Sequence, residues 1–292
     1  MATALVTGGT SGIGAAFARA LSLRGYDLVL VARDESRLRS MAEELGRDGA
    51  TRVEILPADL NVRADVDRVA ARLESTEQPI DFLVNNAGFG IHGSLLERDV
   101  EIHERALNVM CLAVLVLGGA AGRAMKARHK GTILNVSSVA GTIATGNYSA
   151  VKAWTTAYTE GLAVELRDTN VQVSAVLPGW VRTEFHDRAG IRTKSIPEFL
   201  WLDADELVEE CLRDVARGAV LSVPSKRFKV LLFLTRHAPR RGIRWVSGKI
   251  SSSRNKPIEP AAPNDTDPDD TAPNDTEPND TDPNDTVEKV RP

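Results

Sequence analysis

The sequence contains little cysteine and few aromatic residues. Its only two cysteines, Cys111 and Cys211, are a hundred positions apart in a chain of 292 residues. Such sparse thiols argue against a disulfide scaffold or a zinc site, and they are typical of a reducing compartment. An apolar strand follows Met1 almost at once, so we expect no secretory signal. We therefore predict a cytoplasmic protein without a metal site.

The chain also lacks a long apolar run. A membrane-spanning helix needs roughly 18 consecutive apolar residues. The longest candidate, residues 109–121, has 13 uncharged residues and predicts a buried helix instead. With 42% hydrophobic and 26% charged residues, the composition is ordinary for a globular protein. The length favours one large α/β domain with a sizeable core.

Acidic and basic residues are unevenly distributed. Residues 257–292 hold eleven acidic and two basic residues, a net charge of −9, whereas residues 1–256 hold 34 basic and 29 acidic residues, a net charge of +5. In the acidic part, proline recurs every five residues from Pro263 to Pro283, with almost no apolar side chains between. Such a composition buries too little surface to fold, so we expect a disordered tail over 257–292.

A glycine-rich turn dominates the beginning of the chain. The β-prone run 4–6 leads into Thr-Gly-Gly-Thr-Ser-Gly-Ile-Gly at 7–14, and a helix-prone stretch follows over 15–24. Strand, glycine turn and helix is the arrangement that delivers a pyrophosphate to a helix N-terminus. A glycine turn alone could be a structural loop. The second apolar strand, 27–32, makes a dinucleotide site our prediction.

Each glycine of this turn has an expected task. Gly8 permits the tight turn, and Gly12 lets the backbone approach the phosphates. Gly14 lets the helix pack closely against the strand.

The end of the second strand discriminates between the two nicotinamide dinucleotides. A carboxylate there binds the 2′-hydroxyl of NAD, whereas a cation accepts the 2′-phosphate of NADP. Ala32 stands where the carboxylate is expected and Arg33 follows it, which favours NADP(H). Asp34 leaves NAD(H) as the alternative, unless it only caps the next helix. Arg33 could also be a plain surface charge.

Polar or small residues follow the next three strands. Asp59 and Leu60 come just after strand 53–56, and Asp59 could meet the adenine or cap a helix. Asn-Asn-Ala-Gly at 85–88 follows the fourth strand, and Ser137 and Ser138 end the fifth. The carboxyl ends of parallel strands meet at one edge of the sheet, where α/β proteins bind their ligands.

Tyr148 and Lys152 lie four residues apart at the start of a helix-prone run, so both side chains share one helix face. A free phenol has a pKa of about 10, and a nearby ammonium favours the phenolate. Such a pair can move a proton near neutral pH. Asn108 lies in the middle of the long helical region 100–127, where an amide needs partners. It either bonds nearby backbone or anchors a water of the active site.

Taken together, these motifs resemble the short-chain dehydrogenase/reductase family. The motifs are TGGTSGIG at 7–14, NNAG at 85–88, Asn108, NVSS at 135–138, Y-x-x-x-K at 148–152 and Pro178-Gly179. The resemblance covers residues 1–225 and implies a Rossmann-type α/β fold. Its doubly wound, seven-stranded parallel sheet would have the order 3-2-1-4-5-6-7. We expect a single domain over 1–225, a basic apolar segment over 226–256 and the acidic tail.

The resemblance also implies catalytic roles. Tyr148 resembles the acid/base, and Lys152 the residue that lowers the pKa of the tyrosine and holds the nicotinamide ribose. Ser138, rather than the out-of-phase Ser137, resembles the serine that orients the substrate oxygen, and Asn108 the asparagine that holds a relay water. The expected cofactor-binding positions are Gly8, Thr10, Ser11, Gly12, Ile13, Gly14, Arg33, Asp59, Leu60, Asn86, Ala87, Gly88, Tyr148, Lys152, Pro178, Gly179, Val181 and Thr183.

Three features depart from this pattern or exceed it. The loop 141–146 is shorter than in many family members, which leaves the site more open or lets another segment cover it. Segment 184–202 has no clean period and predicts a mobile lid. Its apolar residues favour a hydrophobic substrate, or simply pack the loop down. Residues 221–256 hold ten basic and no acidic residues among apolar ones. They form either a membrane-surface segment or a helix packed on the sheet edge or a sister subunit.

The predicted function is an NAD(P)(H)-dependent oxidoreductase that interconverts a hydrophobic carbonyl and its alcohol. The alternative is a catalytically silent nucleotide sensor or scaffold on the same fold. The resemblance implies a homodimer or homotetramer that pairs through the helix from Val100 and the helix carrying Tyr148. We expect peripheral membrane contact through 221–256 only under the first interpretation of that segment, and no specific nucleic-acid partner.

Overall fold

The computed structural model describes residues 1–47, 49, 51–91, 93–185, 197–239, 241–245 and 247–248. The acidic tail and residues 186–196 of the predicted lid, His186 among them, lie outside the described residues.

A parallel sheet of seven strands forms the centre of the protein, in the order β3-β2-β1-β4-β5-β6-β9. All six neighbouring pairs are parallel. The predicted order is confirmed, with β9 as the seventh strand. The strands are β1 (Thr3–Thr7), β2 (Asp27–Ala32), β3 (Val53–Pro57), β4 (Phe82–Asn85), β5 (Gly131–Val136), β6 (Val171–Val176) and β9 (Leu221–Ser222).

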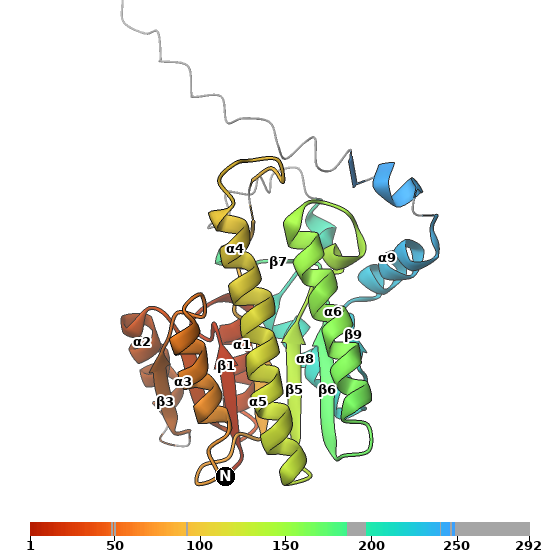
Figure 1. Cartoon of the computed structure of the whole chain (residues 1–292). Helices are drawn as coiled ribbons and strands as arrows, with labels where there is room; N and C mark the ends of the chain where they lie inside the picture. Colours follow the sequence, from red (N-terminus) through yellow and green to blue (C-terminus); the bar gives the residue numbers. More distant parts are fainter. Residues whose placement is uncertain are drawn as a thin grey trace, which may run out of the picture. The chain divides into compact units, whose positions relative to one another are not determined.

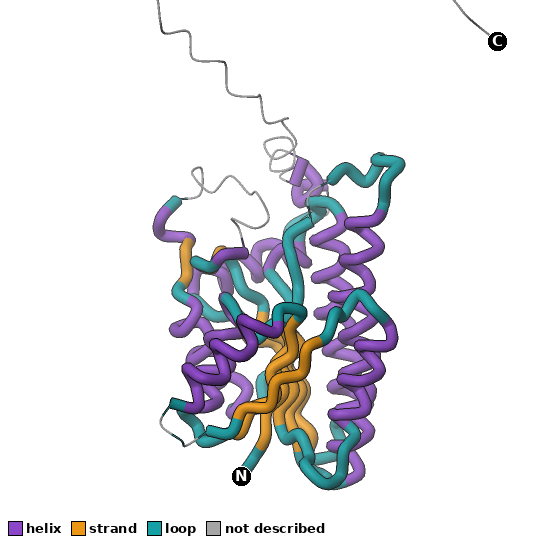
Figure 2. The backbone as a smooth tube through the Cα atoms, turned by 90° about the vertical axis from the view of Figure 1, so that its left-hand side faces the viewer, coloured by secondary structure: helices purple, strands orange, loops and turns teal. Residues whose placement is uncertain are grey.

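Helices cover both faces of this sheet, as Figures 1 and 2 show. Helices α3, α5 and α6 lie against one face, and α1, α2 and α8 against the other. The helices are α1 (Gly12–Ser22), α2 (Glu35–Gly46), α3 (Arg63–Leu73), α4 (Glu101–Leu107), α5 (Ala113–Ala127), α6 (Asn147–Glu165), α8 (Ala204–Ala216) and α9 (Lys226–His237). The Rossmann-type doubly wound fold is thereby confirmed.

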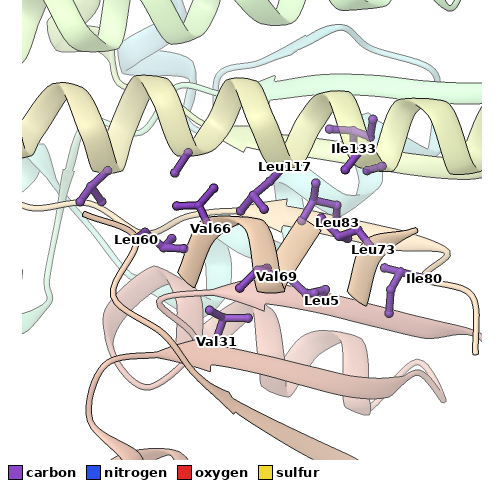
Figure 3. Close-up of a cluster of buried hydrophobic side chains, with 14 of the residues drawn as sticks. Leu5, Val31, Leu60, Val66, Val69, Leu73, Ile80, Leu83, Leu117 and Ile133 are labelled. Carbon is purple, nitrogen blue, oxygen red and sulfur yellow. The ribbon is translucent and has the colours of Figure 1, made fainter. Parts of the chain in front are cut away.

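The period of two along each strand explains the two cores. In β1, Leu5 faces the α3–α5 layer, while Ala4 and Val6 face the α1–α8 layer. Figure 3 shows the first core, in which Val69 of α3 and Leu117 of α5 point toward the strands. Both faces of the sheet are therefore buried, as the continuous apolar strands predict.

Two predicted elements differ at their ends. The first helix begins at Gly12, three residues before its predicted start, because two motif glycines belong to its first turn. The last strand covers only Leu221–Ser222, because it is an edge strand that pairs with two residues of β6.

The predicted helix over 100–127 is interrupted by a π-helix, Asn108–Leu112, between α4 and α5. In the part of the chain that the structure describes, this continuous stretch, Glu101–Ala127, is the one helix long and apolar enough to cross a bilayer. It packs along the sheet, and 61% of its most apolar window is buried. That burial agrees with the predicted core helix.

The carboxyl-terminal part of the body packs across the shortened loop. Phe228 and Leu232 of α9 join a cluster with Ala175, Leu177 and Val223, and Thr235 donates a hydrogen bond to Thr142. Further on, the hydroxyl of Ser247 accepts a hydrogen bond from the amide of Ala144 at 3.0 Å. Another segment thus packs on the short loop, and coverage of the site itself stays a prediction.

Part of the predicted lid is ordered into secondary structure. The short 3₁₀-helix Glu198–Leu200 leads into β8 (Trp201–Leu202), which pairs in parallel with β7 (Trp180–Val181). The chain thus returns beside the segment that follows β6.

Candidate active site

The glycine-rich turn lies at the carboxyl end of β1 and leaves no room for side chains. Gly8 has φ +66°, and Gly12 has φ +53°. A Cβ on Gly14 would overlap the carbonyl oxygen of Gly8 and press on the amide of Asn86. The backbone therefore approaches as closely as the predicted phosphate-binding turn requires.

Thr7 ties this turn to the fourth strand. Its hydroxyl accepts the backbone N–H groups of Asn86 and Ala87 at 2.9 and 3.0 Å. The side-chain amide of Asn86 in turn donates to the carbonyl oxygens of Thr7 and Gly8, at 2.9 and 3.2 Å. The glycine turn and the Asn-Asn-Ala-Gly motif thus form one rigid unit.

The N-terminus of α1 fits an anionic group. The first-turn N–H groups of α1, which follow Ser11, have no acceptor within a regular helix and can bind a ligand. The partial positive charge of this helix end favours a phosphate. Together with the narrow glycine cradle, these residues suit the pyrophosphate of a dinucleotide.

A buried chain of polar side chains positions α6 against the sheet. Asn85 at the end of β4 donates to Asn135 of β5 at 2.9 Å, and Asn135 donates to Thr159 of α6 at 2.9 Å. Buried amides that pair with one another fix the register of the elements that carry them. Helix α6, which begins with the predicted catalytic pair, is thereby held over the strand ends.

Tyr148 and Lys152 meet as the spacing predicts. The ammonium nitrogen of Lys152 lies 5.8 Å from the centre of the Tyr148 ring. Lys152 is 5% exposed, and its Nζ donates to the carbonyl oxygen of Val136 at 2.8 Å. Burial lowers the pKa of Lys152 to about 8. At pH 7 the ammonium form still predominates by about tenfold.

The π-helix brings Cys111 close enough to Lys152 for the two groups to interact electrostatically. Burial raises the pKa of the Cys111 thiol to about 11, although Lys152 opposes this shift. The thiol is therefore neutral and stays a core residue, as predicted, beside the site.

The two serines after β5 have different environments. Ser137 is hydrogen-bonded to α6. Its hydroxyl donates to the carbonyl oxygen of Lys152 at 2.7 Å and also forms a hydrogen bond with the hydroxyl of Thr156. Ser138 lies beside the loop after β6, where its hydroxyl donates to Pro178 at 3.3 Å and accepts from Ala140 at 3.1 Å. Both serines thus have partners, and the role of Ser138 in orienting the substrate oxygen stays a prediction.

Asn108 begins the π-helix, a feature often found at functional sites. Its side chain donates to Asn61 at 3.1 Å, and its carbonyl accepts the N–H group of Ala113. The amide is thus tied to the segment after β3, and a role in a proton relay stays a prediction.

The residues after β3 are less suited to direct side-chain contact with a cofactor. The carboxylate of Asp59 accepts the N–H group of Asn61 at 3.0 Å, and so shapes the turn before α3. Leu60 is buried in the core. An adenine contact by this pair stays a prediction.

The segment after β6 closes the other side of the site. A Cβ on Gly12 would lie 3.2 Å from the Cβ of Thr183, so Thr183 borders the glycine turn. Gly179 has no room for a side chain because the Phe228 ring fills that space. Val181 is buried in the core, so it can reach a ligand only through its backbone.

The predicted cofactor-selecting residues occupy the end of β2. Asp34 caps α2 by accepting the N–H group of Arg37 at 3.1 Å, and Ser36 donates to it at 2.7 Å. These hydrogen bonds lower the pKa of Asp34. Arg33 is exposed and has no ion-pair partner among the described residues. Of the two tasks considered for Asp34, the structure shows helix capping.

Sequence reasoning missed a hollow of about 320 Å³ between the glycine turn and α2. Arg37 lines it and pairs with Glu184 at 3.2 Å. The hollow is lined by Thr10, Ser36, Arg37, Ser40, Met41 and Glu44. Arg37, Ser40 and Glu44 share one face of α2 by their spacing, but that spacing does not set this face against the glycine turn.

Asn147 was also missed. The nitrogen of its side-chain amide is buried without a hydrogen-bond partner in the described part of the chain. It directly precedes Tyr148, and that adjacency was the available signal. The described residues contain no group of three or more His, Cys, Asp or Glu side chains that could hold a metal ion.

Comparison with known proteins identifies the family of the chain. Residues 2–192 match the family described as short chain dehydrogenase. An uncharacterized oxidoreductase of Staphylococcus saprophyticus is 35% identical over 183 residues, which are 62% of this chain and 78% of the relative. A short-chain dehydrogenase from Sphingobium yanoikuyae, solved in complex with NADPH, is 33% identical, with a TM-score of 0.73 over 90% of this chain and 99% of that one. The bulky-bulky ketone specific alcohol dehydrogenase from Comamonas testosteroni is 29% identical, with a TM-score of 0.69 over 89% and 97%.

Proposed function

Because the chain belongs to the short-chain dehydrogenase family, we propose that it is an NADP(H)-dependent oxidoreductase that interconverts a hydrophobic carbonyl compound and its alcohol. The observation that carries this proposal is the pair of Tyr148 and Lys152 on α6, held next to the glycine cradle at the carboxyl edge of the sheet. A nucleotide sensor has no need of an acid/base pair, and no observation favours that alternative.

Each residue of the site has a defined task in this proposal. When bound, the nicotinamide supplies or accepts the hydride. Tyr148 donates its phenolic proton to the substrate oxygen during reduction, and takes it back during oxidation. Ser138 orients that oxygen by a hydrogen bond. Lys152 stabilises the phenolate by its positive charge, which the buried environment leaves poorly screened.

A hydrophobic substrate is supported by the aromatic ring that contacts Tyr148 and by those at β7 and β8. The rings of Tyr148 and Phe185 are 6.1 Å apart, and Trp180 and Trp201 also pack 6.1 Å apart at the pairing of β7 and β8. Bulky apolar side chains at the mouth of a site favour apolar ligands. The named preference of the Comamonas testosteroni relative for bulky ketones agrees with this substrate class.

The proposed function predicts NADPH-dependent reduction of apolar ketones or aldehydes. Purified full-length protein would be mixed with NADPH or NADH and a graded series of aliphatic and aromatic ketones and aldehydes, and absorbance at the reduced-nicotinamide band would be followed. We expect turnover with NADPH that rises with substrate hydrophobicity. Tight binding of NADPH without turnover on any substrate would support the sensor instead.

Cofactor preference is expected to depend on Arg33. The substitution Arg33→Ala removes a cation that would pair with the 2′-phosphate of NADPH. Such an interaction contributes about 1.5–3 kcal/mol to binding. We therefore expect KM for NADPH to rise by about tenfold or more, while KM for NADH changes little. The matched control is Arg47→Ala, an exposed arginine just after the other end of α2. Equal changes for both cofactors would contradict the assignment of Arg33.

A further inference from the structure

Helix α9 has an apolar side that the protein body does not cover. Phe228 and Leu232 are buried on the inner side of the helix. Val230, Phe233 and Leu234 lie on the opposite side, and each is more than half exposed. A helix that is apolar on two opposite sides has more apolar surface than its packing on the body requires. The outer side therefore needs a separate explanation.

Exposed apolar and basic side chains also follow α9 along the chain. Trp245 is 64% exposed, and the neighbouring side chains of Arg241 and Arg244 are exposed as well. Lys226 begins α9 and is also exposed. No acidic residue occurs between Leu221 and Lys256. Figure 1 shows α9 at the periphery, beside β9 at the end of the sheet, and among its basic side chains Lys229 pairs with Glu210 of α8 at 3.0 Å.

We propose that this docking surface, formed by α9 and residues 241–245, binds an anionic lipid bilayer. A helix with apolar residues on one side and flanking basic residues lies in the plane of the membrane interface. Phe233, Leu234 and Trp245 would enter the boundary between headgroups and acyl chains. Arg241 and Arg244 would contact the negatively charged headgroups.

Other occupants fit this surface less well. A second copy of the chain would bring like-charged surfaces together, which opposes pairing. Nucleic acid supplies negative charge but no apolar phase to cover Phe233 and Leu234. The acidic tail, 257–292, likewise supplies charge with almost no apolar side chains. A bilayer alone among these offers both properties.

The docking surface lies next to the candidate active site without being part of it. Thr235 of α9 bonds Thr142, and Ser247 bonds Ala144, so the segment rests on the loop that precedes Tyr148. Membrane binding would therefore place the opening of the site near the lipid surface. The inference concerns binding only and stands whatever reaction the site performs.

The test is sedimentation of the full-length protein with lipid vesicles. Vesicles of phosphatidylcholine alone would be compared with vesicles that contain about 30% phosphatidylserine, at about 0.1 M salt. We expect binding to the anionic vesicles only. Phe233→Ser/Leu234→Ser and Arg241→Glu/Arg244→Glu should each weaken it by about tenfold or more.

Matched control variants carry the same kinds of substitution at exposed residues near the C-termini of α1, α2 and α6. Leu23→Ser removes a similarly exposed apolar side chain, and Arg47→Glu/Arg167→Glu reverses two exposed charges. Both variants should bind the anionic vesicles with an affinity within about twofold of that of the native protein. Reversing two charges far from the docking surface weakens nonspecific electrostatic attraction only modestly.

A second measurement does not depend on stability of the variants. Brominated lipid should quench the fluorescence of Trp245 in the native protein, and Trp245→Phe should lose that part of the quenching. Three outcomes would overturn the proposal. The first is that the full-length protein does not sediment with anionic vesicles. The second is that all variants and controls bind alike. The third is that the native protein is a dimer that does not bind vesicles and that dissociates when Phe233→Ser/Leu234→Ser is introduced.

Discussion

Tyr148→Phe is expected to lower turnover about a thousandfold, while the Kd for NADPH changes by less than about twofold. General acid/base groups typically contribute 10²–10⁴-fold to rate, and phenylalanine keeps the ring while losing the proton. The ring contact with Phe185 and the position above Lys152 should survive, so the cofactor cradle is undisturbed. Steady-state kinetics and NADPH fluorescence titration measure the two quantities.

Tyr158→Phe provides the matched control for this experiment, because it removes a hydroxyl from the same helix. The Tyr158 hydroxyl donates to the carbonyl oxygen of Leu115 at 3.4 Å, and burial raises the pKa of Tyr158 to about 12. That group is therefore unsuited to proton transfer at neutral pH. We expect turnover within about threefold of the native value. Comparable losses in the two variants would show that α6 had been disturbed rather than its chemistry removed.

Lys152→Met is expected to reduce turnover by about a hundredfold or more and, at the same time, to stabilise the protein without cofactor. Burial lowers the pKa of Lys152 from 10.5 to about 8, so holding the ammonium inside the folded protein is unfavourable at pH 7. A shift of this size corresponds to about 3 kcal/mol of unfolding free energy. Loss of the hydrogen bond to Val136 offsets about 1 kcal/mol. The net gain at pH 7 is therefore about 2 kcal/mol.

The sign of the pH dependence follows from the same shift. Between pH 8 and 10.5 the unfolded chain keeps the proton of Lys152 and the folded protein releases it. The stability of the native protein therefore rises with pH across this window, and the advantage of Lys152→Met shrinks. Urea unfolding at pH 7 and pH 10 would measure the difference, with the exposed Lys126→Met as control. A constant difference between native protein and variant would mean that the ammonium is solvated.

The pairing surface implied by the family resemblance stays a prediction. Leu112 and Leu115 on the π-helix and α5, and Val164 on α6, are exposed apolar residues. They occupy the helices through which we expect two copies to associate, and the structure contains one chain.

Local sequence patterns were enough to predict the glycine cradle and the catalytic helix. A glycine turn between a strand and a helix has few conformations available, so Gly8 and Gly14 indicated the cradle directly. The spacing of Tyr148 and Lys152 fixes their shared face once a helix forms. The serine choice was harder, because Ser137 and Ser138 differ only in the direction in which the strand end points them.

What the sequence by itself determined is the glycine turn and the shared helix face of Tyr148 and Lys152, because each depends on a pattern within a few residues, whereas the seven-stranded sheet was implied by the family resemblance. Tertiary structure alone decided three further properties. Lys152 is buried with a lowered pKa, Arg37 lines a hollow beside the glycine turn, and α9 rests on the loop before Tyr148. Each depends on residues far apart in the chain coming into contact, and neither periodicity nor spacing carries that information.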